Sequence, residues 1–334
     1  MRRMLRGLAM AAVVLTGAWG VLALWFQCPG GVAARWGACV AWGIVVAAVL
    51  ACAWRRRGAW PWAAYACAFA GLLAWWGTIR PSNHRDWADD VARPLAASVD
   101  GRRVTLRNVR DFDWRSDTDY DVRWLTRRYD LDALSSADVV LSSWGVPGIA
   151  HALVSFGFDD GSHVVFSVEI RRERSEAYSA LGGFFREFEL AIVAATERDI
   201  IRVRTNVRGE HDQLYRLRLG RPALRAWFLA YARAADRLAA HPAFYNTLGS
   251  NCATVVYRMT KPIDPSLPWD YRLLLTGYLP AYLYKVGVLD RGEPLGLLER
   301  RADITARARA VAAGQDFSRA IRTPAGGGGA IAKP

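Results

Sequence analysis

Acidic residues are missing from the beginning of this 334-residue chain. No Asp or Glu occurs among its first 81 residues, where the only Arg or Lys side chains are arginines at positions 2, 3, 6, 35, 55, 56, 57 and 80. The formal net charge of +13 therefore divides into +8 before residue 82 and +5 after it. A nucleic-acid-binding surface needs basic residues gathered on one folded face, whereas these arginines flank apolar runs. The basic composition thus argues against a nucleic-acid-binding protein.

Cysteine is scarce in the rest of the chain. Four of the five cysteines precede residue 82, which leaves Cys252 alone in the polar part. A lone thiol cannot form an intrachain disulfide within its own domain. It is therefore either a buried apolar side chain or a reactive group.

Motifs that hold metals or nucleotides are also absent. The sequence has no H-E-x-x-H and no paired Cys-x-x-Cys, and its five histidines are scattered. No Gly-rich phosphate loop follows a predicted strand. We therefore predict neither a metal nor a cofactor.

Three long apolar runs fill the acid-free region, at residues 7–26, about 37–54 and 60–79. Each is close to the ~20 residues that a helix needs to cross a bilayer. A cleaved signal peptide for the first run, or buried core helices for all three, are the alternatives. The Trp25–Cys28 stretch, however, lacks the small residues of a cleavage site. We predict a membrane domain of three transmembrane helices over residues 1–81.

The arginines predict the orientation of these helices. Clusters at 2–6 and 55–57 lie on one side of the membrane if the N-terminus is cytoplasmic, as the positive-inside rule requires. Tryptophans near the ends of the runs suit the membrane interface. We therefore predict a multi-pass protein of the bacterial inner (cytoplasmic) membrane, with everything after residue 81 in the periplasm.

Residues 82–310 are predicted to form one α+β domain, followed by a flexible tail over 311–334. β-Branched and aromatic residues predict strands at 104–109, 149–158, 164–171, 188–194, 200–204 and 214–219, with a hairpin turn at Asp159–Ser162. Because these strands follow one another, an antiparallel meander is the simplest sheet. Apolar residues at helical spacing predict a helix over 222–240. A second helix is expected from Cys252 to about Met259, with Ser250 or Asn251 as its N-cap.

Cys252 lies where the second helix begins, and this position favours a thiolate. Free backbone N–H groups and the positive end of the helix dipole lower a cysteine pKa there. A nucleophilic thiol also needs a base within hydrogen-bond reach. Among the histidines we choose His151, since it begins a predicted central strand among small and apolar neighbours. The alternative is that both residues are structural.

A histidine on a strand, then further strands, then Asn-Cys at a helix start resembles the circularly permuted members of the papain-like, NlpC/P60-like superfamily. Four blocks resemble the periplasmic domain of the Lnb-type lipoprotein acyltransferases, and the similarity extends over about 82–310: residues 108–112, 151–156, 167–173 and 244–252. The resemblance implies an antiparallel sheet with packed helices, and acyl transfer through a thioester. Cys252 would attack an ester or amide carbonyl, and His151 would act as base and then as acid. Backbone N–H groups at the helix start, including that of Cys252, would form the oxyanion hole.

Glu169 is our candidate for orienting the His151 imidazole, with Arg171 or Arg172 as its ion-pair partner. An ordinary surface Glu–Arg pair is the alternative. The hairpin register decides between them: a three-residue loop at 160–162 places Glu169 opposite Leu153, on the face of His151. A two-residue loop at 160–161 places it on the other face.

Three further residues are predicted to contact the substrate: Asn251, Arg171 and Tyr245. Leu153, Phe156, Phe244 and Tyr245 are candidates for lining an acyl groove, although each is also a plausible core residue. We expect an apolar groove if the substrate is a lipid and a polar, aromatic-lined cleft if it is a peptide.

The leading functional prediction is a membrane-anchored periplasmic cysteine acyltransferase or lipid hydrolase acting on lipoproteins or phospholipids. One alternative is a cysteine peptidase or amidase acting on cell-wall peptides. Another is a non-catalytic envelope binding module, for which Cys252 and His151 should lie apart. The sequence names neither the acyl donor nor the acceptor.

Overall fold

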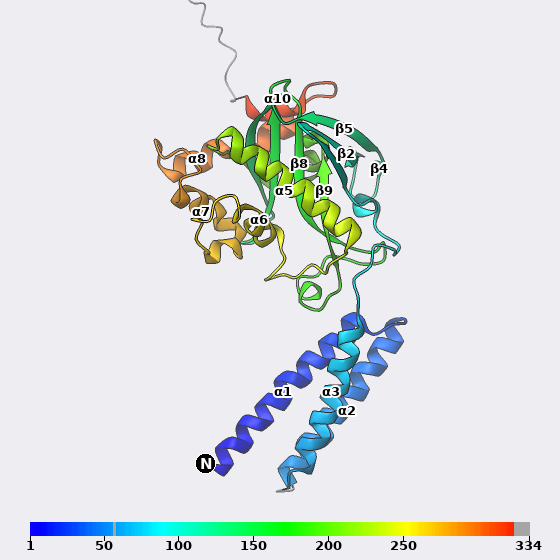
Figure 1. The fold of residues 1–334 in the computed structure, drawn as a ribbon. Coiled ribbons are helices and arrows are strands. Elements are labelled where there is room, and N and C mark those ends of the chain that lie inside the picture. Colours follow the sequence, from blue (N-terminus) through cyan, green and yellow to red (C-terminus); the bar gives the residue numbers. More distant parts are fainter. Residues whose placement is uncertain (56–57, 324–334) are drawn as a thin grey trace, which may run out of the picture. The chain divides into compact units, whose positions relative to one another are not determined.

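The computed structural model describes residues 1–55 and 58–323 (Figure 1). The chain divides into two compact units. The first contains Met1–Ser82 together with Ala177–Glu189, and the second contains Asn83–Glu176 and the chain from Leu190 onward. The contribution of Ala177–Glu189 to the first unit has no counterpart in the sequence analysis.

The first unit is built on helices α1 (Arg2–Gln27), α2 (Val32–Arg55) and α3 (Trp60–Thr78). In the part of the chain that is described, α1 and α2 alone are long and apolar enough to cross a membrane. The prediction of three such helices is therefore wrong. Helix α3 forms where expected but is not one of these two, and it contains Trp, Tyr and Pro residues among its alanines and leucines. Arg56 and Arg57 of the predicted cytoplasmic cluster lie outside the described residues.

Side chains from all three helices meet in a small core. Trp42 of α2 donates its indole N–H to the carbonyl of Gly17, at 3.0 Å. The Trp42 ring occupies the space that a Cβ on Gly20 would fill, so only glycine allows this approach. The Tyr65 hydroxyl of α3 lies 2.7 Å from the hydroxyl of Thr16. The helices are thus held by specific packing as well as by their common hydrophobicity.

Ala177–Glu189, with its short 3₁₀ helix η2 (Gly182–Phe184), packs against the ends of α1 and α3. The Phe185 ring stacks on Phe26 with centroids 5.6 Å apart, and its carbonyl accepts a bond from the Gln27 amide. The Arg186 guanidinium donates to the Trp76 carbonyl and lies 4.7 Å from the Trp76 ring centroid. This segment, which leaves strand β8 of the second unit, is therefore fixed to the helix ends.

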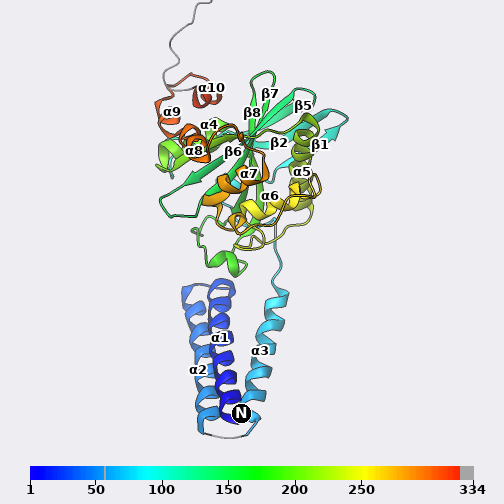
Figure 2. The ribbon, with the colours of Figure 1, turned by 90° about the vertical axis from the view of Figure 1, so that its left-hand side faces the viewer.

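The second unit is an α+β domain around one large sheet (Figures 1 and 2). Its order is β1-β2-β9-β8-β7-β6-β10, and β5 also pairs with β2. The large-sheet strands are β1 (Ala96–Asp100), β2 (Arg103–Arg110), β5 (Trp124–Asp130), β6 (Leu134–Ser143), β7 (His151–Phe158), β8 (His163–Arg171), β9 (Glu189–Ala195) and β10 (His211–Arg216). A separate two-stranded sheet joins β3 (Asp113–Trp114) to β4 (Tyr120–Asp121).

Helices and helical turns complete the unit. Between the strands lie η1 (Asp89–Val91), α4 (Glu197–Arg202) and the π-helix η3 (Val203–Val207). After β10 come α5 (Arg221–Ala240), α6 (Cys252–Thr260), η4 (Tyr271–Leu273), η5 (Thr276–Tyr278), α7 (Leu279–Val286), α8 (Leu295–Ala302), α9 (Thr305–Ala310) and α10 (Phe317–Arg322).

The sheet differs from the predicted meander at two places. Strand β9 pairs with β2 in parallel, so the sheet is mixed and strand order does not follow the chain. Residues 200–204 form helix rather than a strand, because the Thr196 side chain caps α4 by accepting the Asp199 N–H. Ile200 and Ile201 are fully buried there. Their β-branched side chains pack against the sheet from a helix instead of forming part of it.

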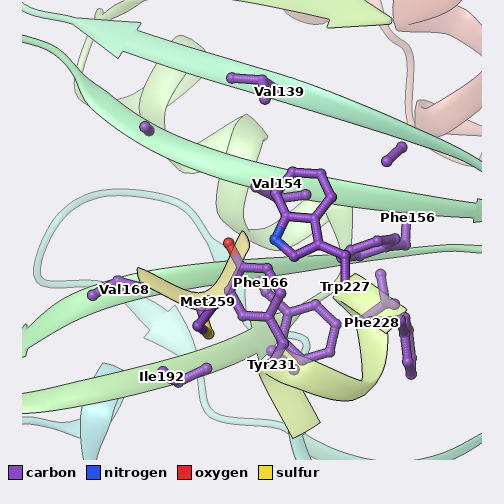
Figure 3. Packing of buried hydrophobic residues seen from close by; sticks show 14 of the residues in the cluster. Val139, Val154, Phe156, Phe166, Val168, Ile192, Trp227, Phe228, Tyr231 and Met259 are labelled. Carbon is purple, nitrogen blue, oxygen red and sulfur yellow. The ribbon is translucent and has the colours of Figure 1, made fainter. Parts of the chain in front are cut away.

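Hydrophobic residues cover both faces of the sheet. On one face, α5 and α6 bury the larger cluster, in which Phe156 and Phe166 of the sheet contact Trp227, Phe228 and Tyr231 of α5 (Figure 3). On the other face, α4, α9 and α10 bury a second cluster. Strand alternation thus assigns successive side chains of β7 to different cores.

The chain beyond residue 310 is folded as far as it is described, which corrects the predicted start of the tail. Phe317 and Ile321 of α10 are buried in the second cluster. Arg322 forms ion pairs with the buried carboxylates of Asp138 and Glu197. These two charges need a cation, and α10 supplies it. The remaining tail, residues 324–334, lies outside the described residues.

Candidate active site

Cys252 is the first residue of α6, as predicted. Asn251 is the N-cap: its side-chain oxygen accepts the N–H groups of Ala253 and Thr254, at 3.0 and 2.8 Å. The Thr254 hydroxyl accepts the Asn251 N–H in return, which completes a capping box. These bonds fix the first turn of α6 and hold the thiol at the positive end of the helix. The Cys252 side chain is largely buried, at 8% exposure.

His151 is the first residue of β7, and a constrained loop brings it there. Gly148 has a φ of +77°, which suits glycine, and the Gly277 N–H donates to its carbonyl. Thr276 of η5 exchanges hydrogen bonds with both backbone groups of Ala150. The strand therefore begins at a defined residue, and the His151 imidazole lies at the end of the sheet.

Glu169 of β8 lies across from His151. The loop has three residues, Asp159–Gly161, so the Phe158 N–H bonds the Ser162 carbonyl and Leu153 pairs with Ser167. Both registers considered from the sequence are therefore wrong by at least one residue, because the left-handed position of the turn falls on Gly161, at φ +83°. In the observed register Glu169 and His151 share a face, and Glu169 Oε1 is 3.1 Å from His151 Nε2.

The thiol, imidazole and carboxylate polarise one another. Burial raises the pKa of the Cys252 thiol, but a hydrogen bond and the positive charge of His151 outweigh it, helped by a bond from the Ala152 N–H. The pKa of Cys252 is thus lowered. Burial lowers the pKa of His151, whereas the charge of Glu169 raises it to about 9. Burial raises the pKa of Glu169, yet the His151 charge holds it well below its usual range. The arrangement therefore favours a thiolate–imidazolium pair.

Two residues that the sequence analysis missed complete the site. The Ser167 hydroxyl donates to Glu169 Oε1 at 2.7 Å and lies 2.8 Å from His151 Nε2. Arg204 of the π-helix donates to the same Glu169 oxygen at 3.0 Å. Ser167 was detectable, because it lies two residues before Glu169 on the same strand face. No sequence signal marked Arg204, whose segment was predicted to be a strand.

Arg204 joins the site to a second buried acidic group. Its other nitrogen is 3.6 Å from Glu210, which accepts a hydrogen bond from Ser142. Ser142 also bonds Asp212. One hydroxyl proton cannot serve both carboxylates, and burial raises the pKa of Asp212 to about 6. Asp212 therefore keeps a proton up to a higher pH than an ordinary Asp. Arg204 pairs with both Glu169 and Glu210.

The predicted arginine partners of Glu169 lie elsewhere. The buried Arg171 guanidinium donates to the carbonyls of Val91 and Ala92 and to the Asn83 side chain. It also lies 4.4 Å from the Trp87 ring centroid. Arg171 thus ties the chain at Asn83, Val91 and Ala92 to the end of β8 instead of pairing with Glu169. Arg172 pairs with Asp90 instead.

The other predicted substrate contacts have mixed outcomes. The Asn251 side chain is buried and uses its oxygen as the cap and its amide on the Thr247 carbonyl, so its role in the described structure is structural. Tyr245 is half-buried in the connection between α5 and α6. Phe156 belongs to the aromatic core, whereas Leu153 lines a cavity beside the site.

The start of α6 provides a single free donor for an oxyanion. Because Asn251 occupies the N–H groups of Ala253 and Thr254, the N–H of Cys252 is the one without a partner in the described part of the chain. The predicted set of several helix donors is therefore reduced to one. That N–H belongs to the nucleophile itself, so it lies next to any carbonyl that the thiol attacks.

An apolar cavity of about 200 Å³ lies beside the site, although the Cys252 and His151 side chains do not line it. Ala152 and Ala253, the residues after His151 and Cys252, both line it. Along α6 the lining residues are Ala253, Val256, Tyr257 and Thr260, whose spacing marks one face of the helix. Helices α5 and α7 supply the other walls.

Residues that could hold a metal are not gathered anywhere in the described ranges 1–55 and 58–323, where no group of three or more His, Cys, Asp or Glu side chains has suitable geometry. No curated protein and no solved structure matches the chain. A family model does match: residues 120–277 correspond to the Lnb N-terminal periplasmic domain. This range contains the cysteine, histidine, glutamate and arginine of the site. The site therefore lies in a segment that matches the Lnb N-terminal periplasmic domain, in a chain whose helices α1 and α2 are long and apolar enough to cross a membrane.

Proposed function

We propose that this protein is a periplasmic cysteine acyltransferase or lipid hydrolase that acts on lipoproteins or phospholipids through a thioester on Cys252. One observation carries the proposal: a buried thiol of lowered pKa at a helix start, bonded to an imidazole that a buried carboxylate keeps protonated. This is the arrangement that activates a cysteine nucleophile. The fold around it would be a permuted papain-like one, as the order His151 before Cys252 suggests.

In the proposed reaction the Cys252 thiolate forms a C–S bond with the carbonyl carbon of an ester, and the carbonyl electrons move onto oxygen. The N–H of Cys252 bonds that oxygen. The C=O bond then re-forms as the C–O ester bond breaks, and the His151 imidazolium gives its proton to the leaving oxygen. Neutral His151 next takes a proton from an incoming amine or water, which attacks the thioester and releases the thiolate.

Glu169, Ser167 and Arg204 would act through His151 rather than on the substrate. Glu169 keeps the imidazole oriented and charged before the attack. Ser167 fixes the carboxylate oxygen that faces the ring. Arg204 pairs with Glu169, and together with the charge of His151 it keeps this buried carboxylate ionised. Their role is to position the base.

The cavity favours lipid over a cell-wall peptide. Its walls are mostly apolar, whereas a peptide site needs placed polar groups for specificity. The non-catalytic alternative required Cys252 and His151 to lie apart, and they are hydrogen-bonded. Neither alternative has an observation of its own that favours it.

The experiment is to incubate the purified full chain with diacyl lipoprotein, with phospholipid and with cell-wall peptide, and to search for adducts on Cys252 by mass spectrometry. An acyl thioester should form with one of the lipids. It should be lost in Cys252→Ser, where an oxygen ester is the most that can form, and retained in the matched control Cys52→Ser, which changes an exposed cysteine of α2. A peptidyl adduct alone would transfer support to the amidase, and no adduct of any kind would contradict the enzyme.

We also propose that the anchor crosses the inner membrane more than once. The support for more than one crossing is the pair of apolar helices α1 and α2, and the support for a periplasmic domain is the family match. Because two crossings return the chain to the side on which it started, α1 and α2 alone would place the N-terminus in the periplasm as well. A reporter that is active only outside the cytoplasm should be active when fused after Pro81. Inactivity of that fusion, with full-length fusion protein present, would contradict a periplasmic domain held by this anchor.

A further inference from the structure

The cavity beside Cys252 has the chemistry of a hydrocarbon site. Its hydroxyl groups are already paired near the wall: the Tyr257 hydroxyl donates to the Leu267 carbonyl at 3.2 Å, and the Tyr282 hydroxyl donates to the Pro268 carbonyl at 3.0 Å. The buried indole N–H of Trp227, which also lines the cavity, has no partner among the described residues. Asp264 accepts the backbone N–H of Ser266. Apart from the Trp227 N–H, these groups have their bonds already, so most of the lining offers a ligand contact with apolar surface. An apolar cavity of ~150 Å³ stays dry and takes up hydrocarbon molecules, and this one is larger.

The cavity is also long in the direction that leads away from the thiol. Its lining residues on α6 begin at Ala253, beside Cys252, and reach Thr260. Seven residues of helix correspond to about 10 Å along the axis. The lining then continues to Ile263 and to Val286 at the end of α7. An acetyl group would leave most of this length empty, whereas an extended acyl chain would fill it.

The segment 269–279 forms part of one wall of the cavity, and it carries apolar or aromatic side chains both toward the cavity and on its exposed side. Leu273 of η4 is buried and lines the cavity. Its neighbours Trp269, Tyr271, Leu275 and Tyr278 are exposed, Trp269 at 63%. Exposed aromatic side chains of this kind favour the membrane interface. A chain leaving a bilayer can therefore pass an apolar rim before it reaches the cavity.

We propose that this cavity, the acyl pocket, binds the hydrocarbon chain of the group that Cys252 accepts and selects long chains over short ones. The inference rests on the proposed function and specifies its substrate: an ester of a long-chain fatty acid, whose carbonyl lies at the thiol and whose chain follows α6 toward Ile263 and Val286. Val256 is a specificity-determining residue, because it lines the pocket one helical turn beyond Cys252.

The test uses the full chain in nanodiscs of ether-linked lipids, which carry no acyl ester. Acylation of Cys252 is followed with the p-nitrophenyl esters of acetate, octanoate and palmitate. Each methylene that enters an apolar site improves binding severalfold, so the specificity constant should rise by about tenfold or more from acetyl to palmitoyl. Val256→Trp fills the pocket and should reduce the palmitoyl-to-acetyl ratio by about tenfold. The matched control Val122→Trp changes an exposed valine far along the chain and should keep the ratio.

A second measurement separates this inference from the proposed function. Radiolabelled palmitate should bind saturably to Cys252→Ser, which has no thiol, and Val256→Trp should weaken that binding. Equal acylation by all three esters, or a ratio that Val256→Trp leaves unchanged in a folded protein, would overturn the acyl pocket while leaving the thiol chemistry intact. Palmitate binding without acylation by any ester would instead keep the pocket and contradict the proposed function. Absence of palmitate binding would overturn the pocket whatever the esters do.

Discussion

Replacing Glu169 by Gln removes the charge that holds a proton on His151. The pKa of His151 is raised from 6.5 to about 9, although burial and the charge of Arg204 both lower it, so Glu169 supplies most of the rise. At ~1.4 kcal/mol per pKa unit, the net shift alone corresponds to about 3 kcal/mol of interaction with the imidazolium. Both side chains are mostly buried, at 14% and 19% exposure, so solvent screening reduces this value little.

In Glu169→Gln the thiolate–imidazolium pair should therefore fall by about 100-fold in population at neutral pH. A thiolate of higher pKa is intrinsically more nucleophilic, with a Brønsted slope of ~0.4–0.5, which recovers about half of that loss on a logarithmic scale. The rate of alkylation at neutral pH should consequently fall by about tenfold. In the parent, the thiolate–imidazolium pair persists as the pH rises until His151 loses its proton, at a pH of about 9. In Glu169→Gln this upper pH limit of the pair should be lower.

The assay is the rate of iodoacetamide alkylation as a function of pH, in a chain whose Cys28, Cys39, Cys52 and Cys67 are serine. Glu173→Gln is the matched control, since Glu173 lies just beyond β8 and forms an ordinary ion pair with Arg85. If Glu169→Gln changed the rate at neutral pH no more than Glu173→Gln does, the account of His151 as a charged partner held by Glu169 would be wrong.

Three further predictions concern stability, each followed by denaturant unfolding of the full chain. Arg204→Met leaves the buried Glu169 and Glu210 without their cation and should cost about 3 kcal/mol; a loss below ~1 kcal/mol would mean that the pairs contribute like surface ones. Asn251→Ala removes the cap of α6 and should cost about 1 kcal/mol, whereas Asn251→Ser, which can still cap, should cost less; equal costs would refute the capping role. Asp212 has a folded pKa raised to about 6 from 3.8, so its contribution to stability is complete below pH 3.8 and is lost as the pH rises through about 6. Asp212→Asn should therefore gain about 3 kcal/mol relative to the parent between low and neutral pH, and a pH-independent difference would refute the raised pKa of Asp212.

The elements that the sequence predicted well are those whose signals are local. The hairpin of β7 and β8 and the helices α5 and α6 lie within one or two residues of their predicted bounds. Strand β6 was missed because its polar residues look like a loop. Its Asp138 is paired with Arg216 and Arg322, which are distant in the sequence. Partners of this kind become visible only in the folded chain.

The residues of the site divide in the same way, into those with a local sequence signal and those that depend on distant partners. Cys252 was predicted from a helix start, and His151 from a strand start, both of which are local patterns. Glu169 depended on a hairpin register that differs by one residue between the plausible turns. Arg204 reaches Glu169 from a π-helix 35 residues further on, where β-branched neighbours had indicated a strand. Tertiary packing overrode that strand propensity, and no pattern in the sequence indicated the contact between Arg204 and Glu169.

The most direct test of the thiolate–imidazolium pair is a titration of Cys252 itself. In the single-cysteine chain, the ultraviolet absorbance of the thiolate is measured against pH, with and without His151→Ala. An ordinary cysteine titrates near pH ~8.5. The account predicts that the Cys252 thiolate forms at a lower pH than this, and that His151→Ala moves its formation to higher pH. A thiol that titrates in the ordinary range or above it, and that His151→Ala does not change, would contradict the account.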